Sequence, residues 1–187
     1  MEEIKNIEGA LEVGHHYAVY NKHVAFWGNV FSNYFLCQFE YKGMKWRSSE
    51  HAYMAEKAIF FGDYPAFLMI LDAKTPAEAK KIGREVKNFD QDAWNRVSYA
   101  IMYDIVYNKF SQNKDLQDAL LRDDLMDKHF VEGSPVDGIW GVKVSWDNPK
   151  IDDESNWDGE NRLGKILDSV RVDLLLERRA NEKSKNA

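Results

Sequence analysis

Residues 47–57, which read Arg-Ser-Ser-Glu-His-Ala-Tyr-Met-Ala-Glu-Lys, have the pattern of a helix start, and the expected fold is built around this helix. Ser48 or Ser49 can cap it, because a serine hydroxyl accepts a hydrogen bond from a backbone N–H of the first turn. Glu50 then lies in the first turn, where the helix dipole favours an ionised carboxylate. Lys57 returns to nearly the same side of the helix two turns later. The two charges can serve a phosphorylated substrate, or they can be a helix-stabilising Glu and a solvated Lys.

The composition is that of a globular protein. The chain has 187 residues, of which 44% are hydrophobic and 13% aromatic, so it can bury a substantial core in one compact domain. The net charge of -6 and the pI near 5.4 argue against a broad contact with a nucleic-acid backbone, which requires basic surface. They leave room for a local basic cleft that binds one phosphate or diphosphate.

The cysteine and histidine content argues against a metal site. Cys37 is the single cysteine, so no internal disulfide forms, and the five histidines do not follow a recognisable ligand pattern. We therefore expect no metal and no other cofactor. Residues 1–5 lack the apolar core of a signal peptide, and no run of about 18 apolar residues is present to span a membrane. The expected location is the cytoplasm, without a membrane partner.

Apolar spacing and turn residues predict a mainly helical chain. The expected helices begin near Ser48 and cover residues 63–71, 75–86, 90–110, 114–121 and 160–177. Short strands are expected over residues 24–27, 34–41, 130–131 and 139–140, with a polar loop over residues 146–159. The fold class is α+β, predominantly helical, in a single compact domain with a small antiparallel sheet. Residues 1–22 would form an N-terminal extension, residues 23–177 the domain and residues 178–187 a charged tail.

Aromatic and small polar residues gather shortly before the helix that contains Glu50. Phe26 and Trp27 are followed closely by Ser32 and Asn33. Such a group suits a planar heterocycle, because aromatic rings stack on its faces while hydroxyl and amide groups bind its edges. The aromatic residues can equally be part of the core.

Three further residues each have two interpretations. Arg84, near the end of its expected helix, can bind a phosphate or complement the negative end of the helix dipole. Arg162, at the start of the last helix, is either a phosphate ligand or a surface charge. Trp94 belongs to the apolar stripe of a long helix, so it packs in the core or lines a cleft at the helix end.

Asp137 lies in the turn sequence Ser-Pro-Val-Asp-Gly-Ile-Trp-Gly at residues 134–141. An aspartate in such a turn commonly accepts hydrogen bonds from the nearby backbone. Together with Glu50, it can instead supply the second carboxylate for acetal-type hydrolysis. One carboxylate would activate water, and the other would stabilise an oxocarbenium-like sugar.

Several short motifs stand in one order from about residue 26 to residue 175. They are Phe26-Trp27, Ser32-Asn33, the segment from Trp46 to Lys57, Pro76, Gly83-Arg84, Trp94, Arg96, Met102, residues 109–113, Val131-Glu132, Asp137, Trp140-Gly141 and Asn161-Arg162-Leu163-Gly164. Read together, they resemble the NADAR superfamily, which includes the YbiA-like N-glycosidases of riboflavin intermediates.

The resemblance implies an N-glycoside hydrolase that cleaves the C–N bond between a phosphoribose or ADP-ribose and a base or amine. The implied catalytic residues are Glu50, Asp137 and Trp94. The substrate-binding candidates, some of which the residues themselves already suggested, are Phe26, Trp27, Ser32, Asn33, Lys57, Arg84, Trp140, Asn161 and Arg162.

Three functions stay open at this point. The first is hydrolysis of phosphoribosylamino-pyrimidine intermediates of riboflavin synthesis, and the second is removal of ADP-ribose from guanine in nucleic acid. The third is a noncatalytic sensor of ADP-ribose or a nucleotide, which the joint presence of Glu50, Trp94 and Asp137 disfavours. The expected partner is accordingly a small phosphoriboside or ADP-ribose conjugate, with ADP-ribosylated nucleic acid as the alternative.

Overall fold

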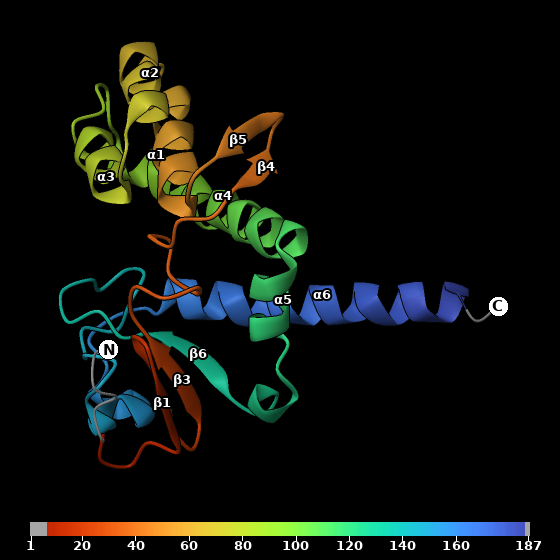
Figure 1. The fold of residues 1–187 in the computed structure, drawn as a ribbon. Helices are drawn as coiled ribbons and strands as arrows, with labels where there is room; N and C mark the ends of the chain where they lie inside the picture. The colour runs from red at the N-terminus through yellow and green to blue at the C-terminus, as the bar shows by residue number, and fades with distance from the viewer. Residues whose placement is uncertain (1–6, 186–187) are drawn as a thin grey trace. The chain divides into compact units, whose positions relative to one another are not determined.

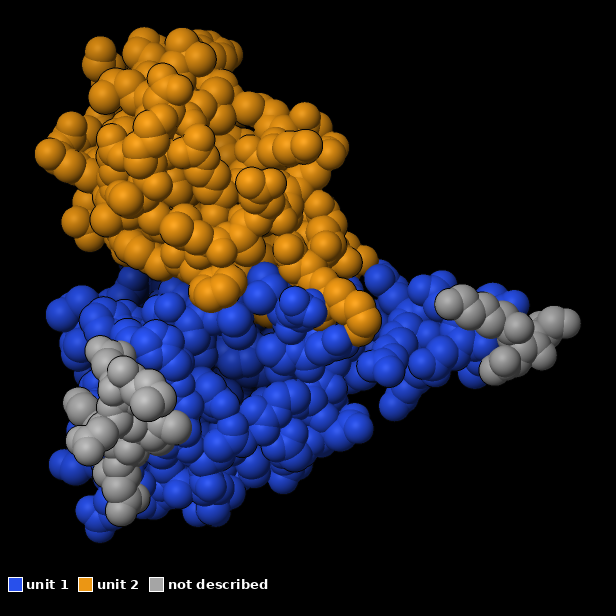
Figure 2. Space-filling model, in the orientation of Figure 1, with its two compact units in different colours: residues 1–32, 115–187 blue, residues 33–114 orange. Residues whose placement is uncertain are grey.

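A computed structural model describes residues 7–185, in which it places six α-helices and six β-strands (Figure 1). Residues 1–6 of the expected N-terminal extension and residues 186–187 of the expected tail lie outside the described residues. Backbone contacts divide the domain into two compact units, one of residues 1–32 and 115–187 and the other of residues 33–114 (Figure 2).

The unit of residues 33–114 is a cluster of helices with a hairpin. Its helices are α1 (Ser49–Phe60), α2 (Tyr64–Asp72), α3 (Pro76–Arg84) and α4 (Gln91–Gln112), and α1 packs against the other three. The strands β4 (Phe39–Tyr41) and β5 (Met44–Trp46) form an antiparallel hairpin that packs on α4. The turn residues Lys42 and Gly43 both have positive φ, as the tightest hairpin turns require.

The helices of this unit begin where the sequence supplies a capping side chain. Ser48, Asp63, Thr75 and Asp90 each accept a hydrogen bond from the backbone N–H three residues later. Each bond satisfies one of the N–H groups that a helix start leaves without an internal partner. The predicted starts of these helices are confirmed to within one residue.

The other unit contains a four-stranded sheet and the long helix α6. The strands are β1 (Glu12–Gly14), β2 (Tyr17–Val19), β3 (His23–Phe26) and β6 (His129–Glu132), in that spatial order. The first three pair antiparallel, whereas β6 lies parallel to β3. The helices of this unit are α5 (Lys114–Leu120), α6 (Arg162–Lys185) and the 3-10 turns η1 (Asp123–Leu125), η2 (Pro149–Asp152) and η3 (Glu154–Asn156). Helix α6 packs against β6.

A hydrophobic core joins this sheet to the segment after β6. Its buried members are Ile7, Ala18, Tyr20, Ala25, Val131, Val142 and Ile151. The Tyr20 hydroxyl donates a hydrogen bond to the Trp146 carbonyl oxygen at 3.0 Å, which anchors the long loop between β6 and α6. The core therefore fixes a loop that contains several of the candidate site residues.

The junction between β6 and α6 is closely packed. A methyl group at Gly164 would lie 2.0 Å from the Phe130 carbonyl oxygen, so a glycine is needed for this approach of helix and strand. Asn161, with φ of 50°, donates from Nδ2 to the same Phe130 oxygen at 2.9 Å. Its Oδ1 accepts the Glu132 N–H at 3.1 Å. The Asn161 amide thus holds the strand to the helix start.

The prediction of an α+β, mainly helical domain with a small antiparallel sheet is confirmed, and β6 adds one parallel pairing. Two strand predictions are wrong. Over residues 34–41 only the last three form a strand, because ahead of them the Cys37 N–H donates to the Arg47 carbonyl outside any sheet. Residues 139–140 form no strand, because the Asp137 carboxylate binds both of their N–H groups.

The chain ends also differ from the expected pattern. Strands β1 and β2 lie within residues 1–22, for which an N-terminal extension was expected, and β2 pairs directly with β3. Helix α6 continues to Lys185 rather than ending near residue 177, since no proline or glycine follows Gly164 to stop it. The helix therefore includes most of the expected charged tail.

Lys109 is a charged residue in the interior of α4. Its side chain is 1% exposed, and Nζ lies 5.7 Å from the centroid of the Phe35 ring and 5.0 Å from that of Phe110. Burial lowers the pKa of Lys109 to about 8, although the nearby Cys37 acts in the opposite direction. The folded protein therefore releases this proton at a lower pH than the unfolded chain.

We expect the free energy of unfolding to rise between about pH 8 and about pH 10, because over this range the unfolded chain binds the Lys109 proton that the folded protein has lost. The full shift corresponds to roughly 3 kcal/mol. Lys109→Met should remove this rise, whereas Lys45→Met, at an exposed site in the same unit, should retain it. Urea denaturation at stepped pH measures the difference, and equal slopes in both variants would contradict the assignment.

Candidate active site

Glu50 lies in the first turn of α1, among hydrogen bonds that fix the helix start. The Ser48 hydroxyl accepts the His51 N–H at 3.3 Å and lies 2.7 Å from His51 Nδ1. The Glu50 N–H donates to the Asn33 carbonyl oxygen at 3.0 Å, and the Glu50 residue is 5% exposed. Burial lowers the pKa of His51, so its ring is neutral at pH 7. A carboxylate held at the positive end of a helix and shielded from water is suited to accept a proton during catalysis.

Asn33 adds a polar group beside this helix start. Its residue is also almost fully buried, and within residues 7–185 its Oδ1 has no hydrogen-bond partner. A buried amide oxygen without a donor is costly, so a ligand that donates to it would gain affinity. Asn33 therefore fits the substrate-binding role predicted for it.

Lys57 lies two turns further along α1, against α3. Its Nζ donates to the Gly83 carbonyl oxygen at 2.9 Å and lies 3.9 Å from the centroid of the Phe89 ring. Burial, and after it the charge of Arg84, lowers the pKa of Lys57. In the described part of the chain, no carboxylate forms an ion pair with Lys57 or with the exposed Arg84. The two predicted phosphate ligands are thus brought together, and an anion between them would relieve their mutual repulsion.

Tyr34 and Lys80 were not predicted from the sequence as site residues. They belong to the same unit as Lys57 and Arg84. Lys80 Nζ lies 5.4 Å from the centroid of the Tyr34 ring, and Lys80 precedes Arg84 by one turn of α3. The pKa of Tyr34 is raised, first by burial and then by the charge of Glu50. The four-residue spacing on α3 was a sequence signal for Lys80. Tyr34 had no such signal, because it lies in a segment expected to be a strand.

Trp94 packs in an aromatic cluster with two residues of α1 and with Phe61, which directly follows that helix. Its ring centroid lies 5.1 Å from that of Tyr53, 5.8 Å from that of Phe60 and 6.2 Å from that of Phe61. The Trp94 residue is 5% exposed. The core interpretation of Trp94 therefore accounts for its surroundings, and its catalytic role stays a prediction.

Asp137 lies in the loop between β6 and α6, in the other unit. Its Oδ1 accepts the backbone N–H groups of Ile139 and Trp140, each at 2.9 Å, and its own N–H donates to the Ser134 hydroxyl. The residue is half-buried. This is the turn arrangement considered from the sequence, and it fixes the carboxylate while Oδ2 accepts no hydrogen bond within residues 7–185.

The other aromatic and small polar candidates differ in exposure. Phe26 is fully buried in β3 and packs edge-on against Phe31, so its ring belongs to the core beneath the loop that follows β3. Trp27 is 47% exposed, and its backbone pairs with His16 through two hydrogen bonds. Ser32 is buried. Of the two adjacent aromatic residues, Trp27 is therefore the one whose ring is available for stacking.

Asn161 and Arg162 lie at the start of α6. Both ends of the Asn161 amide bind the β6 backbone, which leaves Asn161 a structural role in holding the loop. Arg162 is half-buried and pairs through Nε with the Glu160 carboxylate at 2.7 Å. Trp140, also half-buried, accepts the Leu163 N–H at its carbonyl oxygen. The unit of residues 1–32 and 115–187 thus contains Phe26, Trp27, Ser32, Asp137, Trp140, Asn161 and Arg162.

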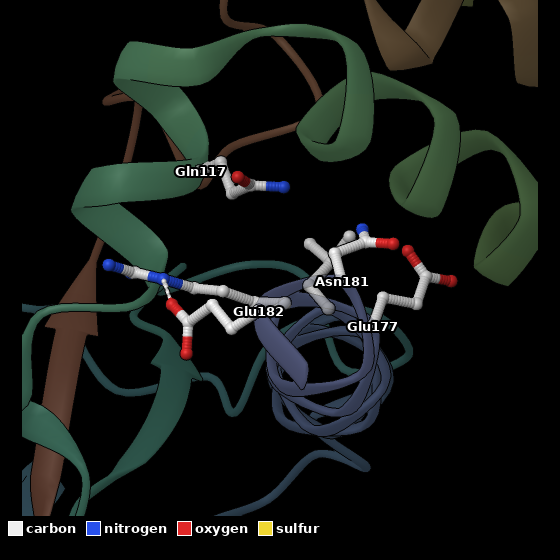
Figure 3. A pocket seen from close by; sticks show the side chains of 6 residues that line it. Gln117, Glu177, Asn181 and Glu182 are labelled. Atoms are coloured by element: carbon white, nitrogen blue, oxygen red, sulfur yellow. Dashed lines mark hydrogen bonds and ion pairs between the residues drawn. The ribbon is translucent and has the colours of Figure 1, made fainter. Parts of the chain in front are cut away.

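A pocket of about 320 Å³ lies between α5 and α6, and Figure 3 shows polar and charged side chains around it. It is lined by Gln117, Leu174, Glu177, Arg178, Asn181 and Glu182. None of these is a candidate from the sequence, and Arg178 is already paired with Glu182. We therefore place the candidate active site at the residues around Glu50 and not in this pocket.

Residues 7–185 contain no group of three or more His, Cys, Asp or Glu side chains placed to hold a metal ion. None of their helices is long and apolar enough to cross a membrane.

Comparisons with known proteins place these observations in a family context. The family model of the NADAR domain matches residues 16–175. An N-glycosidase of Acanthamoeba polyphaga mimivirus is 37% identical over 124 residues, covering 66% of this chain and 72% of that protein. A riboflavin biosynthesis protein of Vibrio vulnificus is 32% identical over 143 residues, covering 76% of this chain and 35% of that protein. The NMR structure of Escherichia coli YbiA, a protein named as an N-glycosidase, matches with a TM-score of 0.68 at 26% identity, over 84% of this chain and 88% of that one.

Proposed function

The chain belongs to the NADAR domain family and is an N-glycosidase, and we propose that its substrate is a phosphoribosylamino-pyrimidine intermediate of riboflavin synthesis. The reaction would break the C–N bond between C1 of the ribose and the amine, with release of ribose 5-phosphate. The similarity to a riboflavin biosynthesis protein supports this substrate class. The basic residues on α1 and α3 support a substrate that carries phosphate.

The observation that carries the proposal is the buried Glu50 carboxylate at the start of α1. In the proposed reaction Glu50 accepts a proton from water, and the water oxygen forms a new bond to C1. The electron pair of the broken C–N bond leaves with the amine, which takes up a proton. Activation of water in this way is general base catalysis, to which a positioned carboxylate contributes strongly.

Asp137 is assigned the second carboxylate role. As the C–N bond breaks, positive charge develops on the sugar ring, and a fixed carboxylate stabilises that charge. Two backbone N–H groups hold Asp137 Oδ1, so the side chain needs little reorganisation when the charge appears. Trp94 is assigned a supporting role, in the packing behind α1.

The remaining candidates are assigned to substrate binding. Lys57 and Arg84 would bind the phosphate, with Arg162 as a further cation. Trp27, whose ring is exposed, would stack on the pyrimidine, since aromatic faces bind planar heterocycles.

Incubation with chemically defined substrates tests the proposal. The protein should release ribose 5-phosphate, identified by mass, from the aminopyrimidine phosphoriboside, and Glu50→Gln protein should not. A parallel incubation uses DNA with ADP-ribosylated guanine. Release of ADP-ribose from the DNA, with the phosphoriboside left intact, would instead assign the protein to reversal of nucleic-acid ADP-ribosylation. Tight binding of ADP-ribose without any product would indicate a sensor.

A further inference from the structure

We propose that Tyr34 and Lys80 are positioning residues that bind the phosphate of the substrate together with Arg84, and so place the sugar at Glu50. This inference rests on the proposed function and adds to its phosphate subsite two residues, Tyr34 and Lys80, that neither the sequence motifs nor the comparisons single out. All of these residues belong to the unit of residues 33–114.

The backbone of Asn33 connects Glu50 to Tyr34. The Glu50 N–H is bound to the carbonyl oxygen of Asn33, which is the residue directly before Tyr34. Tyr34 is partly exposed, and the Glu50 carboxylate is close enough to raise the pKa of its phenol after the larger effect of burial. The phenol therefore stays protonated at neutral pH and can donate a hydrogen bond.

Tyr34 contacts Lys80, one of the cations of α3. The Lys80 ammonium lies 5.4 Å from the centroid of the Tyr34 ring, within the range of a cation–π contact. Lys80 and Arg84 are four residues apart on α3, so they lie on one face of that helix. Next to Arg84, the Gly83 carbonyl oxygen binds Lys57 Nζ. These contacts define a row of groups. It begins with the Glu50 carboxylate and the Tyr34 phenol and continues through the cations of Lys80, Arg84 and Lys57.

The groups in this row suit a phosphate ligand. A phosphate has several strong acceptor oxygens, and charged donors bind it through short, charge-assisted hydrogen bonds. The row offers a hydroxyl donor, ammonium groups and a planar guanidinium in a protein whose net charge is -6. Local basic charge in an acidic protein indicates a specific anion site rather than a general affinity for polyanions.

The test measures binding separately from turnover. Isothermal calorimetry compares ribose 5-phosphate with ribose for the wild type, Lys80→Met, Lys80→Arg and Tyr34→Phe. Lys81→Met, at an exposed position on the same helix, is the matched control. We expect Lys80→Met to weaken ribose 5-phosphate binding by about tenfold to a hundredfold, as loss of a charge-assisted contact implies. Tyr34→Phe should weaken it by about threefold to tenfold. Lys80→Arg should restore most of the affinity, and Lys81→Met should change nothing.

With a phosphoriboside that the protein hydrolyses, Lys80→Met and Tyr34→Phe should raise KM while kcat changes by less than about threefold, since the contact is made before and during the reaction. Lys81→Met should leave KM unchanged. Ribose 5-phosphate affinity equal to wild type in Lys80→Met and in Tyr34→Phe would overturn the inference, as would wild-type protein that does not distinguish ribose 5-phosphate from ribose. If binding follows the expected order while no phosphoriboside is hydrolysed, the subsite stands and the proposed substrate is wrong.

Discussion

Glu50→Gln should lower kcat by about a thousandfold on any substrate that the protein hydrolyses, because a glutamine amide cannot accept the proton of the attacking water. The two side chains have nearly the same size, so the buried position at the start of α1 remains filled. The Glu50 N–H bond to the Asn33 carbonyl involves only backbone and is retained. The loss should therefore appear in turnover, with little change in the free energy of unfolding.

Glu56→Gln is the matched control for this variant. Glu56 is also a buried glutamate of α1, but its carboxylate pairs with Lys42 at 2.7 Å in the hairpin turn. Its replacement should leave kcat within about threefold of wild type, since this carboxylate is already engaged in an ion pair with Lys42 and has no role in the proposed reaction. Glu50→Gln protein with near-normal kcat and an unchanged thermal transition would exclude Glu50 from the chemical step.

Gly164→Ala should lower the free energy of unfolding by about 3 kcal/mol or more, because the added methyl group would overlap the backbone of β6. The added carbon would lie 2.0 Å from the Phe130 carbonyl oxygen and 2.5 Å from Asn161 Nδ2. The higher helix propensity of alanine returns about 1 kcal/mol at most. The steric effect is larger, so α6 must move away from β6 and the Asn161 hydrogen bonds must lengthen.

Urea denaturation measures this effect, with Lys165→Ala as the control at the next, exposed position of α6. The control should shift the unfolding free energy by less than about 0.5 kcal/mol. A Gly164→Ala protein as stable as the control would show that β6 and α6 are not packed as closely as described. Because Asn161 also anchors the loop that contains Asp137, we expect the activity of Gly164→Ala to fall together with its stability.

The parts of the fold that depend on neighbouring residues could be predicted from the sequence. Thr75 before Pro76 defines a helix start almost by itself, since it supplies both a cap and a residue suited to the first turn. The same holds for Ser48 before the segment of Glu50. A capping hydrogen bond joins residues that are three positions apart, so the residue types that form it can be recognised in a short stretch of sequence. This is why the start of α1, in the candidate site, was found from the sequence.

The parts that depend on distant residues could not be predicted in the same way. The parallel pairing of β3 with β6 joins His23 to His129, and the sequence of either strand alone does not specify the other. The contact between Tyr34 and Lys80 likewise joins a loop to a helix. Asn161 shows a third limit: its motif was visible, but only the structure shows that its amide binds the β6 backbone.

The parallel pairing of β3 with β6 also constrains the order in which the chain acquires structure. During synthesis, β3 emerges long before its partner, and the whole segment of residues 33–114 is made in between. The helices of that segment use mainly local contacts, which form quickly, whereas the β3–β6 pair must close a long loop. A segment that has already folded shortens the flexible part of this loop. Early folding of the helices around Glu50 would therefore lower the entropic cost of completing the sheet.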